Sequence, residues 1–333
     1  MDVTGPLVDG FGRAHTDLRI SVTDRCNLRC FYCMSPEGVE FRPHAAILSF
    51  EEIERFVRVV ARFGIRHVRL TGGEPLVRKG VCRLVEMLAA VPGVEDLAMT
   101  TNGILLPEYA ESLRAAGLDR LNISLDTLDP HKFRQISLHD ELPRVLAGVD
   151  AAERAGFRPI KLNALAIRGQ TEDDVVPLAR FARRRAMELR FIEFMPLDGA
   201  DRWQNGSVLP GEEILQILSE GIGPLEPLQD GQPDAPATRY RFVEGGGVIG
   251  LIPSVSEPFC RRCSRLRLTA DGTVQNCLFS TGQWNARTLL RGGGTDEQLA
   301  ALVRQAVCAK KEKHGTESGQ FARTERSMHQ IGG

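Results

Sequence analysis

Along residues 18–194 the chain repeats one pattern, a short segment with a strand period followed by a longer segment with a helix period. The short segments alternate apolar and polar residues or are rich in β-branched residues, which predicts six strands. Between them, apolar residues recur at every third or fourth position, as on one face of a helix. The predicted strands are Leu18–Thr23, His67–Thr71, Asp96–Thr101, Arg120–Leu125, Ile160–Leu165 and Glu188–Phe194.

Residues typical of helix ends bound the segments between these strands. Ser49 with Glu52, and Thr171 with Asp174, have the spacing of a capping box ahead of an apolar-periodic run. Strands and helices that alternate in this way predict a parallel α/β sheet curled into a partial (β/α)6 barrel, with functional groups at the C-terminal strand ends. Further helices are predicted at residues 84–88, 107–117, 142–156 and 211–219.

The pattern changes after about Pro210. Residues 223–237 are rich in Pro, Gln and Asp, which predicts a surface loop. Beyond them, apolar segments on either side of glycine-containing turns predict two β-hairpins. We therefore predict a barrel region at residues 1–240 and a C-terminal region at residues 241–333 that closes the barrel mouth. The hairpins comprise residues 240–243 with 248–252 and residues 265–269 with 273–278.

Composition narrows the class of protein. Hydrophobic residues make up 42% of the 333 positions and charged residues 26%, which is ordinary for a globular protein. The formal net charge of −1 provides no basic field for binding nucleic acid. No apolar run approaches the length of a membrane span, and Met1–Thr16 lacks the features of a secretory signal. We therefore expect a cytoplasmic protein that does not bind membranes.

Cysteine usage points to a metal centre. A reducing cytosol favours metal binding over disulfides for clustered cysteines. Six of the eight cysteines fall into two groups of three. We interpret the other two, Cys82 and Cys308, as buried packing residues.

The first group consists of Cys26, Cys30 and Cys33, directly after the first predicted strand. Three thiolates do not complete a tetrahedral zinc site. Around a 4Fe–4S cluster they would leave the fourth iron without a protein ligand and open to a substrate. The alternative is a reactive-thiol or zinc-knuckle loop.

The second group consists of Cys260, Cys263 and Cys277, again with no fourth cysteine close in sequence. A structural zinc ribbon is the plainer interpretation, but such sites usually have four ligands. The missing ligand favours another cluster with an open iron.

The first group, written C-x-x-x-C-x-Y-C at residues 26–33, resembles the signature of the radical S-adenosylmethionine (SAM) enzymes. With two such groups near opposite ends, the chain is similar from Leu18 to Gly333 to the GTP 3′,8-cyclase family of molybdenum cofactor biosynthesis. The other motifs that carry this resemblance are Leu70–Pro75, Thr100–Gly103, Asn122–Asp126, Phe191–Pro196, Phe259–Gly272 and Gly332-Gly333.

The resemblance implies a partial barrel and a radical SAM lyase with two 4Fe–4S clusters. In this family the first open iron binds SAM, and the resulting 5′-deoxyadenosyl radical abstracts hydrogen from C3′ of GTP. The second open iron binds guanine, and C3′ closes onto C8 to give (8S)-3′,8-cyclo-7,8-dihydroguanosine 5′-triphosphate. The two cysteine groups should therefore face one cavity, with both ends of the chain at the same barrel mouth.

The resemblance assigns SAM contacts to Tyr32, Gly73, Ser124 and Met195. Plainer interpretations exist for each side chain taken alone. Packing within the loop would explain Tyr32, a tight strand-to-helix turn would explain Gly73, and core packing would explain Met195.

The GTP contacts that the resemblance implies are mostly cations on strands. Parallel strands are normally apolar on both faces, so cations within them call for an anionic partner, such as a triphosphate with about four negative charges. A solvated barrel surface is the alternative for any one of them, and β-propensity alone would explain the threonine. Arg265 and Arg267 share one strand face, which should look into the cavity. The implied contacts are Arg19, Arg69, Thr100, Lys161, Arg190, Arg265, Leu266 and Arg267.

Two further positions bear on the site. Terminal glycines usually fray, but the resemblance suggests that Gly332 and Gly333 enter the cavity beside the arginines. His67 stands where many members carry lysine, which would make one phosphate contact weaker or dependent on pH.

The implied partners are GTP, a reductant such as flavodoxin or ferredoxin, cyclic pyranopterin monophosphate synthase downstream, and a second copy of the chain in a homodimer. Two other functions remain as alternatives. A peptide-modifying radical SAM maturase usually carries a longer cysteine array than this one. A zinc module that binds nucleic acid would bind with a steep salt dependence, and the balanced charge argues against it.

Overall fold

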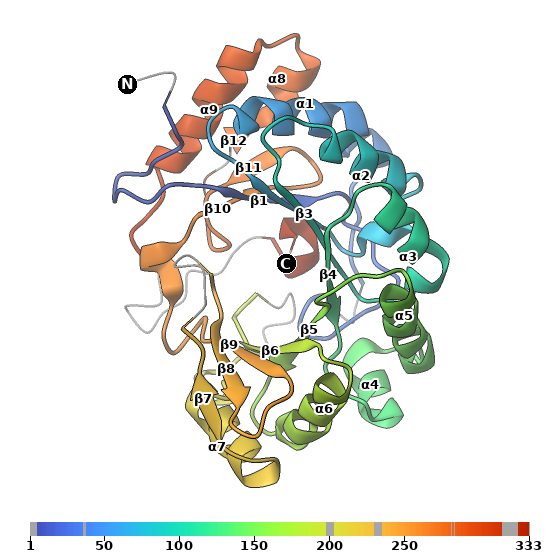
Figure 1. Ribbon diagram of the computed structural model, residues 1–333. Helices are drawn as coiled ribbons and strands as arrows, with labels where there is room; N and C mark the ends of the chain where they lie inside the picture. Colours follow the sequence, from blue (N-terminus) through green and yellow to red (C-terminus); the bar gives the residue numbers. More distant parts are fainter. Residues whose placement is uncertain are drawn as a thin grey trace.

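The computed structural model describes residues 5–35, 38–197, 203–229, 235–280, 282, 284–314 and 326–332. A curved sheet forms its centre, and most helices cover the convex side (Figure 1). In the described residues the sheet has twelve strands in the order β12-β11-β10-β1-β2-β3-β4-β5-β6-β9-β8-β7. Its two end strands, β12 and β7, do not pair, so the barrel is partial.

The predicted βα repeat is confirmed. Strands β1 to β6 pair in parallel with their neighbours in chain order. They comprise Asp17–Ser21, His67–Thr71, Asp96–Thr101, Arg120–Ser124, Lys161–Ala166 and Glu188–Glu193. The helices between them are α1 (Phe50–Ala61), α2 (Val81–Ala89), α3 (Leu106–Ala115), α4 (Pro130–Ser137), α5 (Leu142–Arg154) and α6 (Glu172–Arg184).

Both predicted hairpins form, and each adds a strand to one end of the parallel sheet. Strand β9 pairs in parallel with β6, and β10 pairs in parallel with β1. The C-terminal region therefore extends the barrel at both ends, and the predicted division near residue 240 stays a prediction. Its strands are β7 (Leu225–Pro227), β8 (Thr238–Phe242), β9 (Val248–Ile252), β10 (Arg265–Leu268), β11 (Thr273–Gln275) and β12 (Trp284–Asn285).

Several helices and two strands, β7 and β12, were not predicted. Strand β7 lies within the predicted surface loop and pairs with β8. Helix α4 follows β4. The C-terminal helices pack on the barrel through long-range contacts, and their sequences show a weaker hydrophobic periodicity. The C-terminal helices are α8 (Ala286–Arg291), α9 (Asp296–Cys308) and α10 (Met328–Ile331), and α7 (Gly211–Gly221) was predicted.

One of the two predicted capping boxes is wrong. Ser49 and Glu52 cap α1 reciprocally, as predicted. The side chain of Thr171 instead bonds Ile167, and Asp174 accepts from Thr127 Oγ1 at 2.6 Å. Asp174 is buried, and its carboxylate accepts a hydrogen bond from a neighbouring segment and not from the backbone at the start of the helix.

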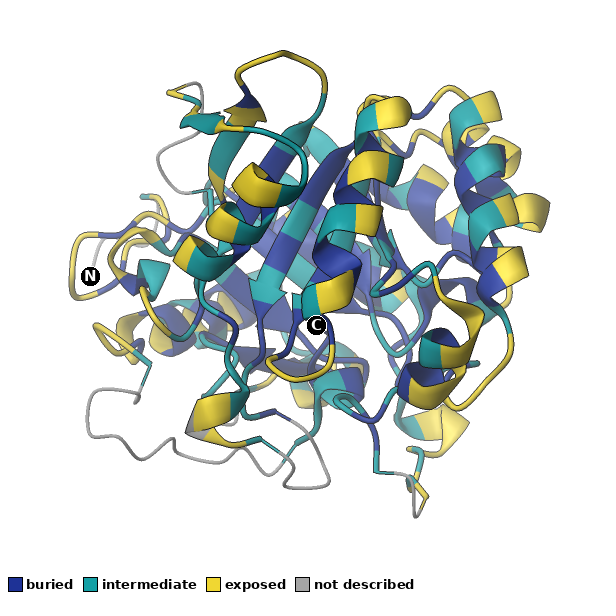
Figure 2. Cartoon of the chain, turned by 90° about the horizontal axis from the view of Figure 1, so that it is seen from below, coloured by how far each residue is buried: buried dark blue, intermediate teal, exposed yellow. Residues whose placement is uncertain are grey.

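The strands of the barrel have two chemically different faces. On β1, Leu18 and Ile20 are fully buried in the core between the sheet and the outer helices. Arg19 lies on the opposite face, because successive side chains alternate across a strand. Buried residues concentrate where the helices pack on the sheet, and the helices expose the sides that face away from the sheet (Figure 2). The inner face of this parallel sheet is therefore polar.

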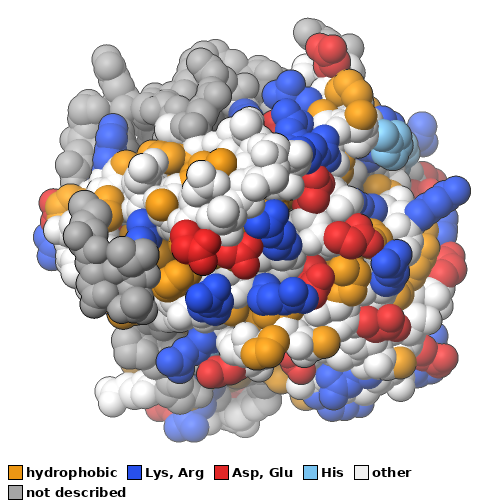
Figure 3. All heavy atoms as spheres, turned by 90° about the horizontal axis from the view of Figure 1, so that it is seen from above, with side chains coloured by type: hydrophobic (Ala, Val, Ile, Leu, Met, Phe, Trp, Pro, Cys, Tyr) orange, Lys and Arg blue, Asp and Glu red, His pale blue; other side chains and the backbone are white. Residues whose placement is uncertain are grey.

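Ion pairs attach the C-terminal helices to the start of the barrel. Arg55 of α1 pairs with Asp296 of α9 at 2.9 Å, and Arg291 of α8 pairs with Glu52 at 2.6 Å. Cys308 at the end of α9 is exposed, so its interpretation as a buried packing residue is wrong. Basic and acidic side chains are interspersed over the face shown in Figure 3.

Among the described helices, none combines the length and the apolar character that a membrane crossing requires.

The close packing of α5 on the turn after β3 gives a test of the fold. A Cβ on Gly148 would lie 2.0 Å from the Gly103 carbonyl oxygen. We expect Gly148→Ala to lower the free energy of unfolding by about 1–3 kcal/mol, because the backbone must move. Gly10→Ala is the control, since no atom lies within 4 Å of its Cβ position. Equal urea midpoints for the two variants would contradict this prediction.

Candidate active site

The first cysteine group lies in the loop after β1, at the C-terminal edge of the sheet. Backbone hydrogen bonds join this loop to the turn after β2: Gly73 N donates to Thr23 O at 2.7 Å, and Glu74 N donates to Arg25 O at 2.8 Å. A Cβ on Gly73 would lie 2.3 Å from Arg25 O, so only glycine allows this approach. Gly73 thus places the cysteine loop, whatever else it contacts.

The three cysteines of the first group are half-buried, and their thiols interact electrostatically with one another. Burial raises the pKa of Cys26 to about 11 and that of Cys33 to about 12, and it raises the pKa of Cys30 well above its usual value. The backbone N–H of Leu28 donates to Cys26 Sγ at 3.4 Å. Without a metal these thiols stay protonated, and metal binding would release their protons.

This donor set fits a cluster better than a single ion. In the described part of the chain, no three His, Cys, Asp or Glu side chains converge closely enough to hold one metal ion. A 4Fe–4S cluster holds its cysteine sulfurs further apart than a single ion does, because each cysteine binds a different iron.

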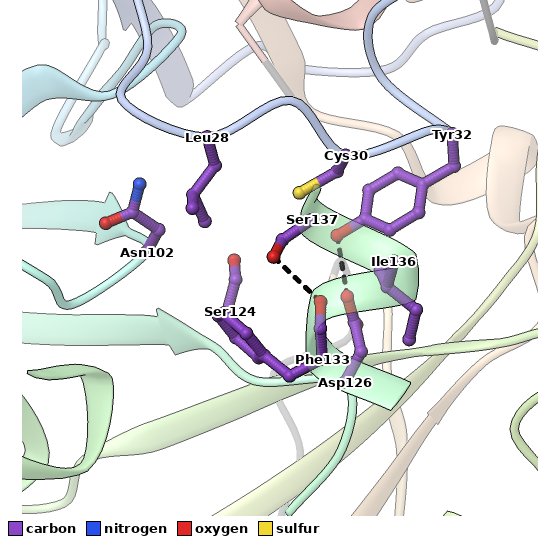
Figure 4. A pocket seen from close by; sticks show the side chains of 9 residues that line it. All are labelled: Leu28, Cys30, Tyr32, Asn102, Ser124, Asp126, Phe133, Ile136 and Ser137. Atoms are coloured by element: carbon purple, nitrogen blue, oxygen red, sulfur yellow. Dashed lines mark hydrogen bonds between the residues drawn. The ribbon is translucent and has the colours of Figure 1, made fainter. Parts of the chain in front are cut away.

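A pocket opens beside Cys30 and below the cysteine loop (Figure 4). Tyr32 OH donates to Asp126 Oδ2 at 2.7 Å, and Asp126 Oδ1 accepts from Leu165 N at 2.8 Å. Burial raises the pKa of Asp126, and burial together with Asp126 raises that of Tyr32. The lining residues are Leu28, Cys30, Tyr32, Asn102, Ser124, Asp126, Phe133, Ile136 and Ser137.

The structure therefore brings together two predicted SAM residues, Tyr32 and Ser124, with the cysteine between them. Met195 lies just past β6, half-buried, and does not line this pocket. Sequence analysis missed Asp126, although its position directly after β4 was a usable signal. It also missed the wall that α4 contributes, because that helix was not predicted.

The buried side chain of Glu74 holds the turn that follows β3. Its carboxylate accepts from Thr101 Oγ1 at 2.8 Å and from Asn102 N at 2.7 Å. Burial raises the pKa of Glu74 to about 7. Asn102 in turn donates to Asn27 Oδ1 at 2.7 Å, inside the cysteine loop. The side chain of Glu74 is thus occupied by the protein itself.

Three of the predicted GTP contacts form a row of arginines across the inner face. The register pairs Arg19 of β1 with Arg69 of β2 on one side and Arg267 of β10 on the other. Burial, followed by neighbouring arginines, lowers the pKa of Arg69 and of Arg267 to about 10 and lowers that of Arg19 well below its usual value. Like charges this close call for an anion between them.

Other inner-face cations continue around the sheet. Arg190 Nε donates to Glu188 Oε1 at 2.5 Å, and burial followed by Arg190 lowers the pKa of Lys161 to about 8. Arg69 Nη1 and Arg265 Nη2 are buried without a hydrogen-bond partner. Among the described residues, no carboxylate lies within ion-pair distance of Arg19, Arg69, Lys161, Arg265 or Arg267.

The two uncharged predicted contacts lie on opposite faces. Thr100 is on the inner face of β3, opposite Asn122 of β4, whose Oδ1 is buried without a partner. The side chain of Leu266 is fully buried in the outer core. Only the backbone of Leu266 can therefore contribute to the inner face.

The second cysteine group lies at the opposite edge of the sheet from the first. Cys260 and Cys263 precede β10, Cys277 follows β11, and the three thiols interact electrostatically. Because β10 runs parallel to β1, these cysteines lie at the N-terminal edge. The prediction that both ends of the chain lie at the same barrel mouth is therefore wrong for the second cysteine group, and the prediction that the two groups face one cavity stays a prediction. The cationic inner face separates the two groups.

The C-terminal tail does reach the mouth beside the first group, in the centre of the barrel in Figure 1. Arg267 Nη1 donates to the carbonyl oxygen of Gly332. Gly332 has a φ of 80°, and a Cβ there would lie 2.5 Å from Thr71 Oγ1. Gly333 lies outside the described residues.

Comparisons with known proteins agree with this geometry. Residues 20–182 match the radical SAM superfamily, and residues 187–316 match the family described as Molybdenum Cofactor Synthesis C. The chain is 51% identical over 330 residues to GTP 3′,8-cyclase of Rhodopirellula baltica, covering 98% of this chain and 92% of that protein. It is 44% identical to GTP 3′,8-cyclase of Pelotomaculum thermopropionicum, covering 98% and 100%.

The chain belongs to the GTP 3′,8-cyclase family.

A solved structure supports the fold of this cyclase-family chain. Streptococcus suis SuiB bound to S-adenosylmethionine superposes with a TM-score of 0.60 over 90% of this chain and 68% of that one, at 15% identity. The resemblance and the fold class predicted from sequence are confirmed. The individual contacts to SAM and GTP remain predictions.

His67 of this family member has a partner at the N-terminal edge. Its Nδ1 lies 3.8 Å from Asp17 Oδ2, which also accepts from Ser264 Oγ at 2.6 Å. The interaction with Asp17 raises the pKa of His67. Protonated His67 therefore adds stability that is complete below a pH of about 6.5 and is lost as the pH rises through its folded pKa.

We expect Asp17→Asn to lower the pKa of His67, because burial, which favours the neutral imidazole, is then unopposed by the carboxylate. The pKa is measured by NMR titration of the His67 ring protons in the protein with oxidised clusters. The variant should also lose more stability at pH 6 than at pH 8. An unchanged titration of His67 would contradict the pairing.

Proposed function

We propose that this chain is a GTP 3′,8-cyclase, a radical SAM lyase that converts GTP to (8S)-3′,8-cyclo-7,8-dihydroguanosine 5′-triphosphate in molybdenum cofactor biosynthesis. Its relatives at 44–51% identity carry that name over nearly the whole chain. The observation that carries the proposal is the set of unpaired inner-face cations lying between two three-cysteine groups.

Cys26, Cys30 and Cys33 would hold the first 4Fe–4S cluster. When bound, this cluster supplies the electron that cleaves SAM. Tyr32 and Ser124 line the pocket beside Cys30, so the adjacent cavity is the place for SAM. Gly73 and Met195, which follow β2 and β6, would complete the SAM site from the C-terminal edge.

The inner-face cations would hold the triphosphate. Arginine binds phosphate oxygens through two parallel N–H donors and keeps its charge when buried. Arg19, Arg69 and Arg267 are already adjacent, so a triphosphate would relieve their mutual repulsion. Lys161, Arg190 and Thr100 face the same space from the other strands.

Cys260, Cys263 and Cys277 would hold the second cluster, where guanine binds. Arg265 begins the strand that follows Cys263, and its guanidinium stacks on Phe259 with the Cζ 4.4 Å from the ring centroid. The substrate would then lie along the barrel axis, with its base toward the N-terminal edge and its ribose toward SAM. The backbone of Leu266 lies between Arg265, beside the base, and Arg267, beside the triphosphate.

Gly332 and Gly333 would close the mouth beside the triphosphate. The hydrogen bond from Arg267 to Gly332 O, which connects an inner-face arginine to the tail, supports this role. The tail would therefore orient that guanidinium and keep water out of the mouth.

The cellular context is part of the proposal. A low-potential reductant such as flavodoxin or ferredoxin would supply the electron, and cyclic pyranopterin monophosphate synthase would consume the product. We propose that the protein is cytoplasmic, because GTP and reduced cysteines are both available in the cytoplasm. We also propose that it forms a homodimer, as the resemblance to the family implies.

Anaerobic reconstitution with iron and sulfide, followed by SAM, dithionite and GTP, should yield 5′-deoxyadenosine and a cyclised nucleotide, measured by liquid chromatography and mass spectrometry. Cys277→Ala should retain the first cluster and lose cyclisation, because the second group loses one thiol. SAM cleavage by the unaltered protein without any cyclised nucleotide would refute the proposed function.

The role of the arginine row predicts a specific loss of affinity. Arg69→Met should weaken GTP binding on the order of 10- to 100-fold, the range expected when a hydrogen bond to a charged group is removed. Arg66→Met is the matched control, because Arg66 is exposed and pairs with Glu95 at 3.7 Å. Isothermal titration under anaerobic conditions measures both. Equal dissociation constants for the two variants would rule out the assignment.

A further inference from the structure

A buried lysine lies against the second cysteine group. Lys310 follows α9 and is 5% exposed. Its Nζ donates to Cys263 Sγ at 3.5 Å and to Arg265 O at 2.9 Å. An ammonium group in contact with a cysteine sulfur is a charge-assisted donor to a future cluster ligand.

Backbone contacts from the N-terminal segment hold Lys310 in place. Arg13 Nη2 donates to Lys311 O at 2.7 Å, and Arg13 Nη1 donates to Cys260 O at 2.6 Å. Asp9 Oδ2 accepts from Arg13 Nε at 2.6 Å, and both side chains are buried. One arginine thus fixes both a cysteine of the second group and the segment that carries Lys310.

The lysine has no carboxylate partner among the described residues. The negative groups that act on it are the thiolates of Cys263 and Cys277. Burial alone would raise the pKa of Cys263, but Lys310 and Arg265 lower it. The second group therefore has a cationic surrounding.

The first group has a different surrounding. Carboxylates lie near it: Asp126 lines the pocket beside Cys30, and Glu74 accepts from the backbone of Asn102, whose side chain bonds Asn27 inside the cysteine loop. A nearby positive charge stabilises the reduced, more negative form of a cluster, and a nearby negative charge stabilises the oxidised form. The two groups are thus built for clusters of unequal reduction potential.

We propose that Lys310 is a positioning residue for the second 4Fe–4S cluster that compensates its charge and raises its reduction potential above that of the first. This inference rests on the proposed function only in that the second cysteine group holds such a cluster. A first cluster of lower potential is the stronger reductant for SAM, and a second cluster of higher potential is reduced before it and so does not withdraw that electron.

The test compares four variants of the full-length reconstituted protein. Lys310→Met and Lys310→Gln remove the charge, and the second of these keeps a polar donor. Lys310→Arg keeps the charge. Lys311→Met is the matched control, because Lys311 is exposed and only its backbone carbonyl is used.

The readouts are iron content per chain and the midpoint potentials of both clusters, followed by electron paramagnetic resonance during a dithionite titration. A variant that lacks Cys26, Cys30 and Cys33 identifies the signal of the second cluster. The charge-free variants should shift the second midpoint to more negative potential, by more than the difference between wild type and Lys311→Met. The first midpoint should stay unchanged, and Lys310→Arg should lie close to wild type.

Each outcome decides the inference. Loss of the second cluster from both charge-free variants, with retention in Lys310→Arg, also supports it, because the charge is then needed to hold the cluster. An unshifted second midpoint in a charge-free variant with a full iron load overturns it, as does cluster loss in all three Lys310 variants. Neither readout depends on turnover, so a protein that holds both clusters without cyclising GTP still tests Lys310.

Discussion

The inner face of the barrel carries more positive charge than the protein itself neutralises. Arg19, Arg69 and Arg267 meet across adjacent strands, and burial, followed by repulsion from other nearby arginines such as Arg265, lowers the pKa of Arg69 and Arg267 to about 10. Burying unpaired charges is costly, so such an arrangement persists only where the surrounding fold is stable and a ligand supplies the anion. The outer core of Val, Leu and Ile side chains between sheet and helices provides that stability.

The same constraint explains why both ends of the chain are needed. Strand β10 carries two of the arginines and enters the sheet next to β1, so the cationic row forms only when residues far apart in sequence pair. Ion pairs between α1 and the C-terminal helices, and the Arg13 contacts to residues 311 and 312, attach the C-terminal region to the start of the barrel. The substrate site and the attachment of the C-terminal region are thus one structural feature.

Much of the site was predictable because its chemistry is local. The cysteine spacings, the strand that precedes Cys26 and the glycine turn at Gly73 all lie in short segments. Other features depend on partners that the local pattern does not name. Asp174 accepts a hydrogen bond from Thr127 and does not cap its helix, and Asp126 accepts one from Tyr32. Cys308 is exposed because only one side of α9 packs on the barrel.

By itself, the sequence determined which ligands and charges are available: two sets of three thiols, cations at alternate strand positions, and six βα repeats to carry them. The tertiary structure decided where they lie. Parallel pairing of β10 with β1 placed the second cysteine group at the N-terminal edge of the sheet, across the arginines from the first. The direction in which a strand pairs depends on hydrogen bonds to residues far away in sequence, so the local sequence of the strand does not determine that direction.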